Sequence, residues 1–272
     1  MTVNAAAGVS AQTLIPALGL PEGSRVDQRV PKKLLLENVA STASDKRLIT
    51  EAIEEIQWIA ALKPNTIGVP SYRDAQREYL EIAVLAVTLR GAVKPASLAR
   101  LAELMHRAVP YPVLLLMQGP ALTLSLAHKR WAQNEAGKVV LEGDPVSASL
   151  PHATEDAAAV EDAIAPQIER AFVQSLSIAR QPQTTLHALY QGWVDCVQAL
   201  LAARLTGSYQ TPTTPEQAAA RRQALADCER LEAEVSRLRA QAAKEKQIAR
   251  QVELNLTLKR VQAELAAAME SL

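Results

Sequence analysis

The last part of the chain, residues 216–272, contains no glycine, proline or aromatic residue, although the whole chain has 10 Gly, 15 Pro, 3 Trp, 5 Tyr and 1 Phe. Ala, Leu, Glu, Arg, Gln and Lys dominate this part, and these residues are strong helix formers. It is therefore predicted to be one long helix of about 85 Å at 1.5 Å per residue. The compact core must come from the residues before it.

Apolar residues in this segment recur at the alternating three- and four-residue spacing of a coiled coil. One set is Cys228, Leu231, Val235, Leu238 and Ala242, and the other is Leu254, Leu258, Val261, Leu265, Ala268 and Leu272. The sets are out of phase, which indicates a stutter or a change of partner face around residues 244–251. We predict a coiled-coil interface, for self-association or a partner helix, at Leu231, Val235, Leu238, Leu254, Leu258, Val261 and Leu265. The alternative is a single amphipathic helix packed along the globular part.

A polar segment that contains Gly207, Pro212 and Pro215 precedes the long helix. Gly207 can end the preceding helix in a left-handed conformation, and the prolines prevent its continuation. Thr214 can cap the next helix, with Pro215 in its first turn. We therefore predict an irregular arm over residues 1–43, an α+β domain over 44–150, a helical segment over 151–210 and a coiled-coil helix over 216–272.

The region from 44 to 150 mixes helical and strand patterns. Apolar spacing predicts helices over residues 44–62 and 95–108, and strands over 66–69, 79–90, 113–117, 121–128 and 138–142. The segment 79–90 also admits a helix, because Ala and Leu are frequent in it. Residues 155–165, 166–180 and 184–205 are predicted to be helices. The fold class is α+β: a small mixed sheet with flanking helices, an all-helical segment and a long C-terminal coiled-coil helix.

The charge balance excludes several classes of protein. The chain has 29 Lys+Arg and 29 Asp+Glu, so it is neither a globally basic nucleic-acid binder nor an acidic solvating chain. Two cysteines exclude a disulfide scaffold and a cysteine-rich zinc module. The longest apolar runs are far shorter than the roughly 18 residues of a membrane span, and the N-terminus lacks the cations of a secretory signal. We expect a soluble cytoplasmic protein with no membrane partner.

No motif in the sequence points to a reaction. The phosphate-binding loop, the dinucleotide-binding glycine pattern and the serine nucleophile elbow are all missing. The four histidines, His106, His128, His152 and His187, are too scattered to predict a metal site. We therefore predict no catalytic residue, metal or cofactor. A divergent metal-dependent nuclease is kept as an alternative, with Glu78, Glu81, Glu142 and Asp144 at strand ends as its carboxylates.

Two groups of cations could contact nucleic acid. His128, Lys129, Arg130 and Trp131 follow a predicted strand and combine cations with an aromatic ring that can stack on a base. The N-terminal arm carries Arg25, Arg29, Lys32 and Lys33, which Glu22, Asp27 and Glu37 largely offset. The same residues would also suit a solvated strand end and local ion pairs, so DNA remains one potential partner among others.

Several stretches resemble one bacterial family. They are Leu20-Pro-Glu22, Val26-Asp-Gln-Arg-Val-Pro-Lys-Lys33, Leu62-Lys-Pro-Asn-Thr-Ile67, residues 79–89 and Tyr111-Pro-Val-Leu114. The pattern is similar to the "domain of unknown function 4391" family over residues 18–270. The resemblance implies neighbours rather than a reaction, because members tend to be encoded beside a helicase-like ATPase and a DNA methyltransferase in restriction-like, anti-phage defence loci. The family has no established catalytic residues to carry over.

The expected function is therefore that of a non-enzymatic accessory or scaffold subunit in such a defence complex, with the helicase-like ATPase and/or the methyltransferase as partners. The missing catalytic motifs and the long C-terminal helix favour it. The alternatives are the nuclease effector and a DNA-binding module of the same system.

Overall fold

The structure is a computed structural model that describes residues 9–38, 42–133, 135, 137–151 and 165–272. The chain divides into two compact units, Met1–Val197 and Gln198–Leu272. In the described residues, no helix combines the length and the apolar character needed to cross a membrane.

A six-stranded mixed sheet forms the centre of the first unit, in the order β1-β2-β5-β6-β7-β10. Its strands are β1 (Arg25–Arg29), β2 (Ile53–Leu62), β5 (Ile82–Leu89), β6 (Val113–Gln118), β7 (Ala121–Leu126) and β10 (Val146–Pro151). The β5–β6 pair is parallel and is joined through helix α5 (Pro95–Ala108), whereas all other neighbours in this sheet are antiparallel. The predicted α+β class with a mixed sheet is confirmed.

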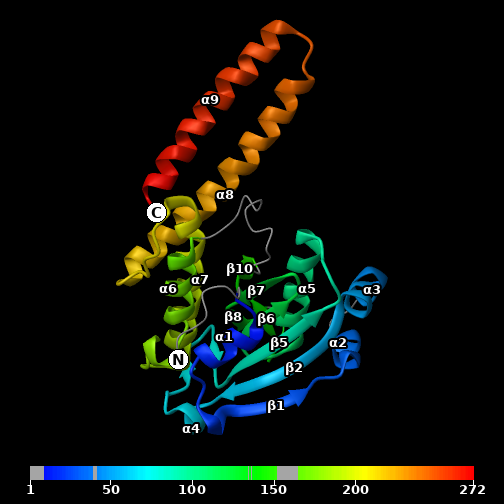
Figure 1. The fold of residues 1–272 in the computed structure, drawn as a ribbon, viewed down its shortest axis with the longest axis vertical. Coiled ribbons are helices and arrows are strands. Elements are labelled where there is room, and N and C mark those ends of the chain that lie inside the picture. The colour runs from blue at the N-terminus through cyan, green and yellow to red at the C-terminus, as the bar shows by residue number, and fades with distance from the viewer. Residues whose placement is uncertain (1–8, 39–41, 134, 136, 152–164) are drawn as a thin grey trace. The chain divides into compact units, whose positions relative to one another are not determined.

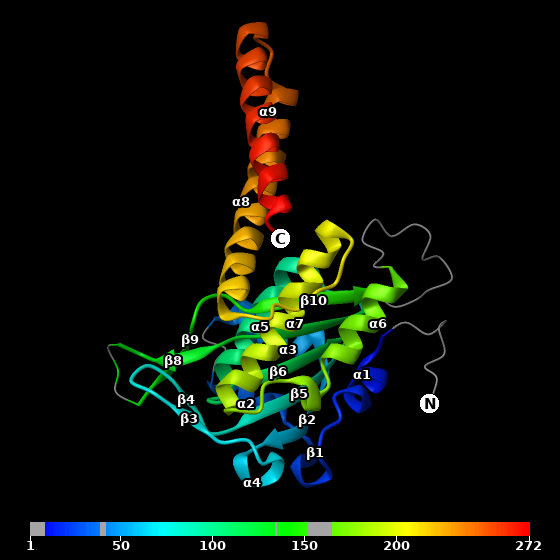
Figure 2. The same cartoon turned by 90° about the vertical axis from the view of Figure 1, so that its left-hand side faces the viewer.

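Helices cover both faces of this sheet (Figures 1 and 2). One face carries α2 (Lys32–Asn38), α3 (Ala43–Ala52) and α5, and the other carries α1 (Ala11–Ala17), α6 (Pro166–Ser175) and the first turns of α7 (Leu186–Thr206). Leu85 and Val87 of β5 and Leu115 of β6 pack with Leu101 and Met105 of α5 in one apolar cluster. Because both faces are covered, β5 and β6 are almost continuously apolar, as expected for inner strands.

The predictions for 95–108 and 113–117 are confirmed as α5 and β6, and the strands predicted over 79–90 and 121–128 are β5 and β7, although Tyr79 belongs to β4 and β7 ends at Leu126. Pro95 occupies the first turn of α5, where a missing N–H costs nothing. Residues 119–120 connect β6 to β7 in an antiparallel hairpin.

The prediction of a helix over residues 44–62 is wrong in its second half. The helix α3 ends at Ala52, and residues 53–62 form strand β2, paired with β1 and β5. The pairing with β5 shifts register twice, between Ile53 and Glu55 and between Trp58 and Ala60. These irregularities place buried isoleucines at 53, 56 and 59, a three-residue spacing that resembles a helical face.

Three other boundaries also differ from the prediction. Residues 66–69 do not form a strand; a helical turn α4 (Pro64–Ile67) begins with proline and ends at Gly68 with φ 73°. The arm over 1–43 is not irregular where it is described, since it supplies α1, a 3-10 turn (Glu22–Ser24), β1 and α2. Strand β10 was not predicted at all.

In the helical segment, the prediction for 155–165 lies outside the described residues except at its last position. The helix predicted over 166–180 ends at Ser175 and is followed by a 3-10 turn (Ile178–Arg180), and the helix predicted over 184–205 is α7.

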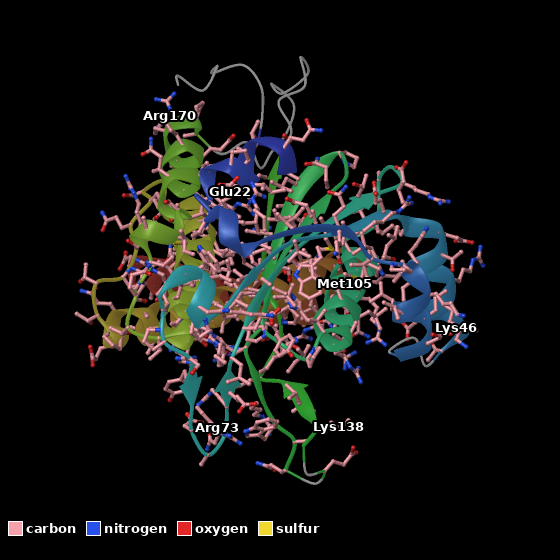
Figure 3. All side chains as sticks on the ribbon, turned by 90° about the horizontal axis from the view of Figure 1, so that it is seen from below. Glu22, Lys46, Arg73, Met105, Lys138 and Arg170 are labelled. Carbon is pink, nitrogen blue, oxygen red and sulfur yellow. The ribbon has the colours of Figure 1, made fainter. Side chains whose placement is uncertain are left out.

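Two short hairpins lie beside each other at one side of the first unit (Figures 2 and 3). One consists of β3 (Tyr72–Arg73) and β4 (Glu78–Tyr79), and the other of β8 (Lys129–Trp131) and β9 (Val139–Leu141). The backbone N–H of Trp131 donates to the carbonyl of Gln76 at 2.8 Å and so links them. Strand β9 lies within the predicted strand over 138–142, whereas β3, β4 and β8 were not predicted.

The second unit contains an antiparallel pair of helices, α8 (Pro215–Lys244) and α9 (Ile248–Glu270) (Figure 1). The single long helix predicted over 216–272 is therefore interrupted at residues 245–247. There, Oε1 of Glu245 accepts hydrogen bonds from the N–H groups of Lys246 and Gln247, at 2.8 and 2.9 Å, which fix the turn between α8 and α9. The break coincides with the phase shift in the apolar spacing, because the first of the two apolar sets lies in α8 and the second lies in α9.

Candidate functional site

The two hairpins and the first turns of α7 bring five rings together, which we call the ring cluster: Tyr72, Tyr79, His128, His187 and Tyr190. Tyr72 stacks on His187 with centroids 4.8 Å apart, and the His128 and His187 rings are 5.4 Å apart. Tyr79 and Tyr190 are fully buried behind them. The cluster therefore joins segments that are distant in the sequence.

Backbone hydrogen bonds fix Tyr190 in this cluster. Its hydroxyl donates to the carbonyl of Val113 and accepts from the N–H of Ala127, both at 2.8 Å. Burial raises the pKa of Tyr190 well above its ordinary value. This ring therefore anchors α7 to the ends of β6 and β7 as a neutral phenol.

His128 forms the polar centre of the ring cluster. Its Nδ1 lies 2.5 Å from the hydroxyl oxygen of Tyr79, while its buried Nε2 forms no hydrogen bond in the described part of the chain. Burial lowers the pKa of His128 to about 4 and raises the pKa of Tyr79. The pair is therefore uncharged at neutral pH.

A charged pair covers the same region. The Arg77 guanidinium binds Glu142 with two hydrogen bonds, from Nε at 2.6 Å and from Nη2. Asp74 accepts from the hydroxyl of Tyr72 and from the backbone N–H groups of Gln76 and Arg77, which builds the β3–β4 turn. The bond from Arg77 holds the pKa of Glu142 below its ordinary value. Arg77 thereby ties the first hairpin to the end of the second.

Beside this cluster lies a pocket of about 200 Å³ between the β8–β9 hairpin and residues 110–111. Its lining residues are Glu78, Leu80, Pro110, Tyr111, Lys129, Arg130, Trp131, Gly137 and Val139. Leu80 and Tyr111 are among the exposed large apolar side chains of the described chain. The pocket therefore combines an apolar and aromatic wall with nearby cations.

Lys129 is buried, whereas a contact with phosphate requires an accessible cation. Only 3 % of it is exposed, and its ammonium donates to the carbonyls of Val109 and Tyr111. Burial lowers the pKa of Lys129 to about 7, although the two carbonyls favour its charged form. This cation fixes the rim of the pocket rather than facing solvent.

Of the predicted cluster 128–131, Arg130 and Trp131 remain accessible. Both are half-buried and line the pocket. Nη1 of Arg130 donates to the carbonyl of Trp131 at 3.2 Å, and in the described residues Arg130 forms no ion pair. Arg130 is thus the cation in this pocket that can meet a ligand anion.

The four cations of the arm do not form a shared basic surface. Arg25 lies 3.8 Å from Asp27, Arg29 lies 3.4 Å from Glu55, and Lys33 lies 3.5 Å from Glu37. Lys32 donates instead to the carbonyl of Ile53 at 2.6 Å, and burial lowers its pKa. Each cation therefore has a local partner.

The carboxylates of the nuclease alternative are also engaged separately. Glu78 lies 3.2 Å from Arg73, Glu142 binds Arg77, and Glu81 is buried beside Lys63 at 3.1 Å. Asp144 is exposed. Within the described residues, no group of three or more His, Cys, Asp or Glu side chains could hold a metal ion.

The predicted interface residues pack against one another within the chain. Leu231, Val235 and Leu238 of α8 form an apolar cluster with Val261 of α9, and Leu254, Leu258 and Leu265 pack against it. We call this cluster the seam. The seam is buried between α8 and α9, so a partner must bind another face of these helices.

The ring cluster and one further feature of α9 were not predicted from the sequence. Ile248, Val252 and Leu256 are exposed by 79, 52 and 65 %. We call these three residues the outer stripe. Their four-residue spacing places them on one face of α9, and the same spacing was visible in the sequence. The ring cluster had no such signal, because its members come from separate segments.

Comparison with known proteins gives one match. A family model described as "Domain of unknown function (DUF4391)" matches residues 18–265. No curated protein and no solved structure matches the chain.

Proposed function

Because the chain belongs to the DUF4391 family, a family of unknown function, we propose that it is a non-enzymatic accessory or scaffold subunit of a bacterial anti-phage defence complex. Its partners in this proposal are the helicase-like ATPase and/or the DNA methyltransferase of the same locus, as the family resemblance implies.

The outer stripe of α9 is the observation that carries this proposal. At about 100° per residue, the outer stripe and the seam lie roughly 150° apart around α9. Only the seam is covered by α8. A surface helix normally has one apolar face, so a second apolar face on α9 favours a binding partner.

The state of the carboxylates also supports a non-enzymatic role. Glu78, Glu81 and Glu142 each pair with a different cation, and these contacts hold them apart in separate pairs. Ion pairs of this kind stabilise hairpins and strand ends. Because these carboxylates are engaged in ion pairs, the outer stripe is the feature that still needs a function.

Co-purification from cells that carry the whole locus tests this proposal. The tagged full chain should retain a helicase-like ATPase or a methyltransferase, and Val252→Glu should lose it. Ala240→Glu adds the same charge to an exposed position of α8 and should retain the partner. Failure to recover either class of partner with the unaltered chain would refute the proposal.

A DNA-binding module is the second candidate, because the pocket beside β8 combines Trp131 and Tyr111 with the unpaired Arg130. Aromatic rings can stack on bases, while an arginine binds phosphate. Single-stranded DNA should then bind in a salt-dependent manner. Arg130→Ala should weaken binding, whereas Arg47→Ala, at an exposed cation paired with Glu51, should not.

A further inference from the structure

The segment from the end of α8 through the first half of α9, which carries the outer stripe, has an excess of positive charge. Residues 244–260 include five cations, namely Lys244, Lys246, Arg250, Lys259 and Arg260, against the two anions Glu245 and Glu253, so their net charge is +3. The whole chain, by contrast, has a net charge of zero. The segment that carries the exposed apolar residues is therefore positive, although the chain as a whole is neutral.

Most of this charge is free to act on a partner. In the described residues, Lys244, Lys246 and Lys259 form no ion pair within 4.0 Å. Glu245 is engaged in the α8–α9 turn through its bonds to two backbone N–H groups. Arg260 lies 3.7 Å from Glu264, but both side chains are mostly exposed and such pairs contribute little.

We infer that the outer stripe binds an acidic amphipathic helix of a protein partner, an inference that rests on the proposed function. The apolar face of that helix covers Ile248, Val252 and Leu256, and its Asp and Glu side chains lie opposite the lysines around the stripe. The partner helix packs on α9 from the side away from α8 and completes a three-helix arrangement. Apolar burial provides affinity, and the opposite charges select the partner.

Charge also argues against a second copy of this chain as the occupant. Pairing two outer stripes would bring two regions of net charge +3 together. Like charges across an interface are unfavourable and discriminate against that partner. The same charge makes an anionic lipid surface the other occupant to be tested.

Two synthetic helical peptides test the inference on the full chain. Both carry Leu with alternating three- and four-residue spacing on one face; the acidic probe has Glu at its other polar positions and the basic probe has Lys there. The acidic probe should bind at least about tenfold more tightly than the basic probe at ~50 mM salt, and the ratio should shrink at ~500 mM salt. Fluorescence anisotropy measures both affinities.

Variants of the chain identify the surface. Val252→Glu should weaken the acidic probe by at least about tenfold, while Ala240→Glu should not. The triple variant Lys244→Glu, Lys246→Glu and Lys259→Glu leaves the three apolar residues of the outer stripe intact and should make the basic probe the tighter ligand. Equal binding of the two probes to the unaltered chain, or no binding of either, would overturn the inference.

Two further outcomes would replace the partner helix with another occupant. A dimer in light scattering that Val252→Glu dissociates would make the occupant a second copy. Binding to phosphatidylserine-containing vesicles without binding of the acidic probe would make it a membrane. If co-purification of a locus partner depends on Val252 but the acidic probe does not bind, the proposed function stands and only this inference fails.

Discussion

Nδ1 of His128 and the hydroxyl of Tyr79 face each other at 2.5 Å, where the end of β7 meets the β3–β4 hairpin. The ring of Tyr190 lies 6.0 Å from that of Tyr79 and 5.3 Å from that of His128, and both residues of the pair are largely buried. The bond therefore satisfies two polar groups that water reaches poorly. It also joins the β3–β4 hairpin to the residue that follows β7.

Tyr79→Phe should destabilise the first unit by about 1–3 kcal/mol, because it leaves Nδ1 of His128 without its partner at a largely buried site. Denaturant unfolding measures the loss. Tyr111→Phe is the matched control, since Tyr111 is 36 % exposed and water can replace its hydroxyl contacts. Equal stability of both variants would mean that the His128–Tyr79 bond contributes nothing.

The stability of the protein should fall as the pH drops from about 6.5 toward 4. The pKa of His128 is lowered to about 4 in the folded state, so only the unfolded chain takes up this proton across that range. The free energy of unfolding therefore rises with pH there. His128→Asn should reduce this slope, leaving the shares of His106, whose pKa burial lowers to about 3, and of His187, whose pKa burial also lowers. An unchanged slope would show that His128 is charged in the folded protein.

Gly192→Ala should destabilise the protein by about 1–3 kcal/mol through overpacking. A Cβ at this position would lie 2.6 Å from Oε1 of Gln181 and 2.7 Å from Cδ of Pro182. Gln181 has little room to move, because its Nε2 donates to the carbonyls of Ser175 and Ser177 at 2.6 and 3.0 Å. Thermal unfolding compares it with Gly23→Ala, where a Cβ meets nothing within 4 Å.

Val261→Glu should open the α8–α9 pair. Val261 is 4 % exposed within the seam, so a carboxylate there is desolvated without a partner and costs several kcal/mol. Hydrogen exchange over residues 215–270 should accelerate. Gln262→Glu introduces the same charge one residue away at an exposed position and should leave the exchange rates nearly unchanged. Similar rates in both variants would contradict the seam.

The parts of the fold with regular local patterns were predictable from the sequence. Helix α5 shows its apolar face at helical spacing after a proline, and the β6–β7 hairpin shows two apolar runs around Gly119. Strand β2 was not predictable in this way, because its bulges hide the two-residue period. Strand β1 is mostly exposed and charged, so it has no apolar alternation to detect.

The candidate site was less predictable because it depends on long-range contacts. The cluster 128–131 was identified as one group, but the structure turns Lys129 inward to two carbonyls and leaves Arg130 and Trp131 at the pocket. Local sequence does not determine which way consecutive polar side chains point at the end of a strand. Likewise, nothing near Tyr72 in the sequence indicates that it stacks on His187.

The strand order of the large sheet, β1-β2-β5-β6-β7-β10, is also the order of these strands along the chain. During synthesis, each new strand can therefore add to the open edge of the strands already made, and none has to insert between two that have paired. Sheets that grow from sequence neighbours form at a lower entropic cost than those that wait for distant segments. The first turns of α7 emerge after all six strands, so Tyr190 can bond to Val113 and Ala127 only once the sheet is complete. Docking of α7 would then mark the end of folding of this unit at the ribosome.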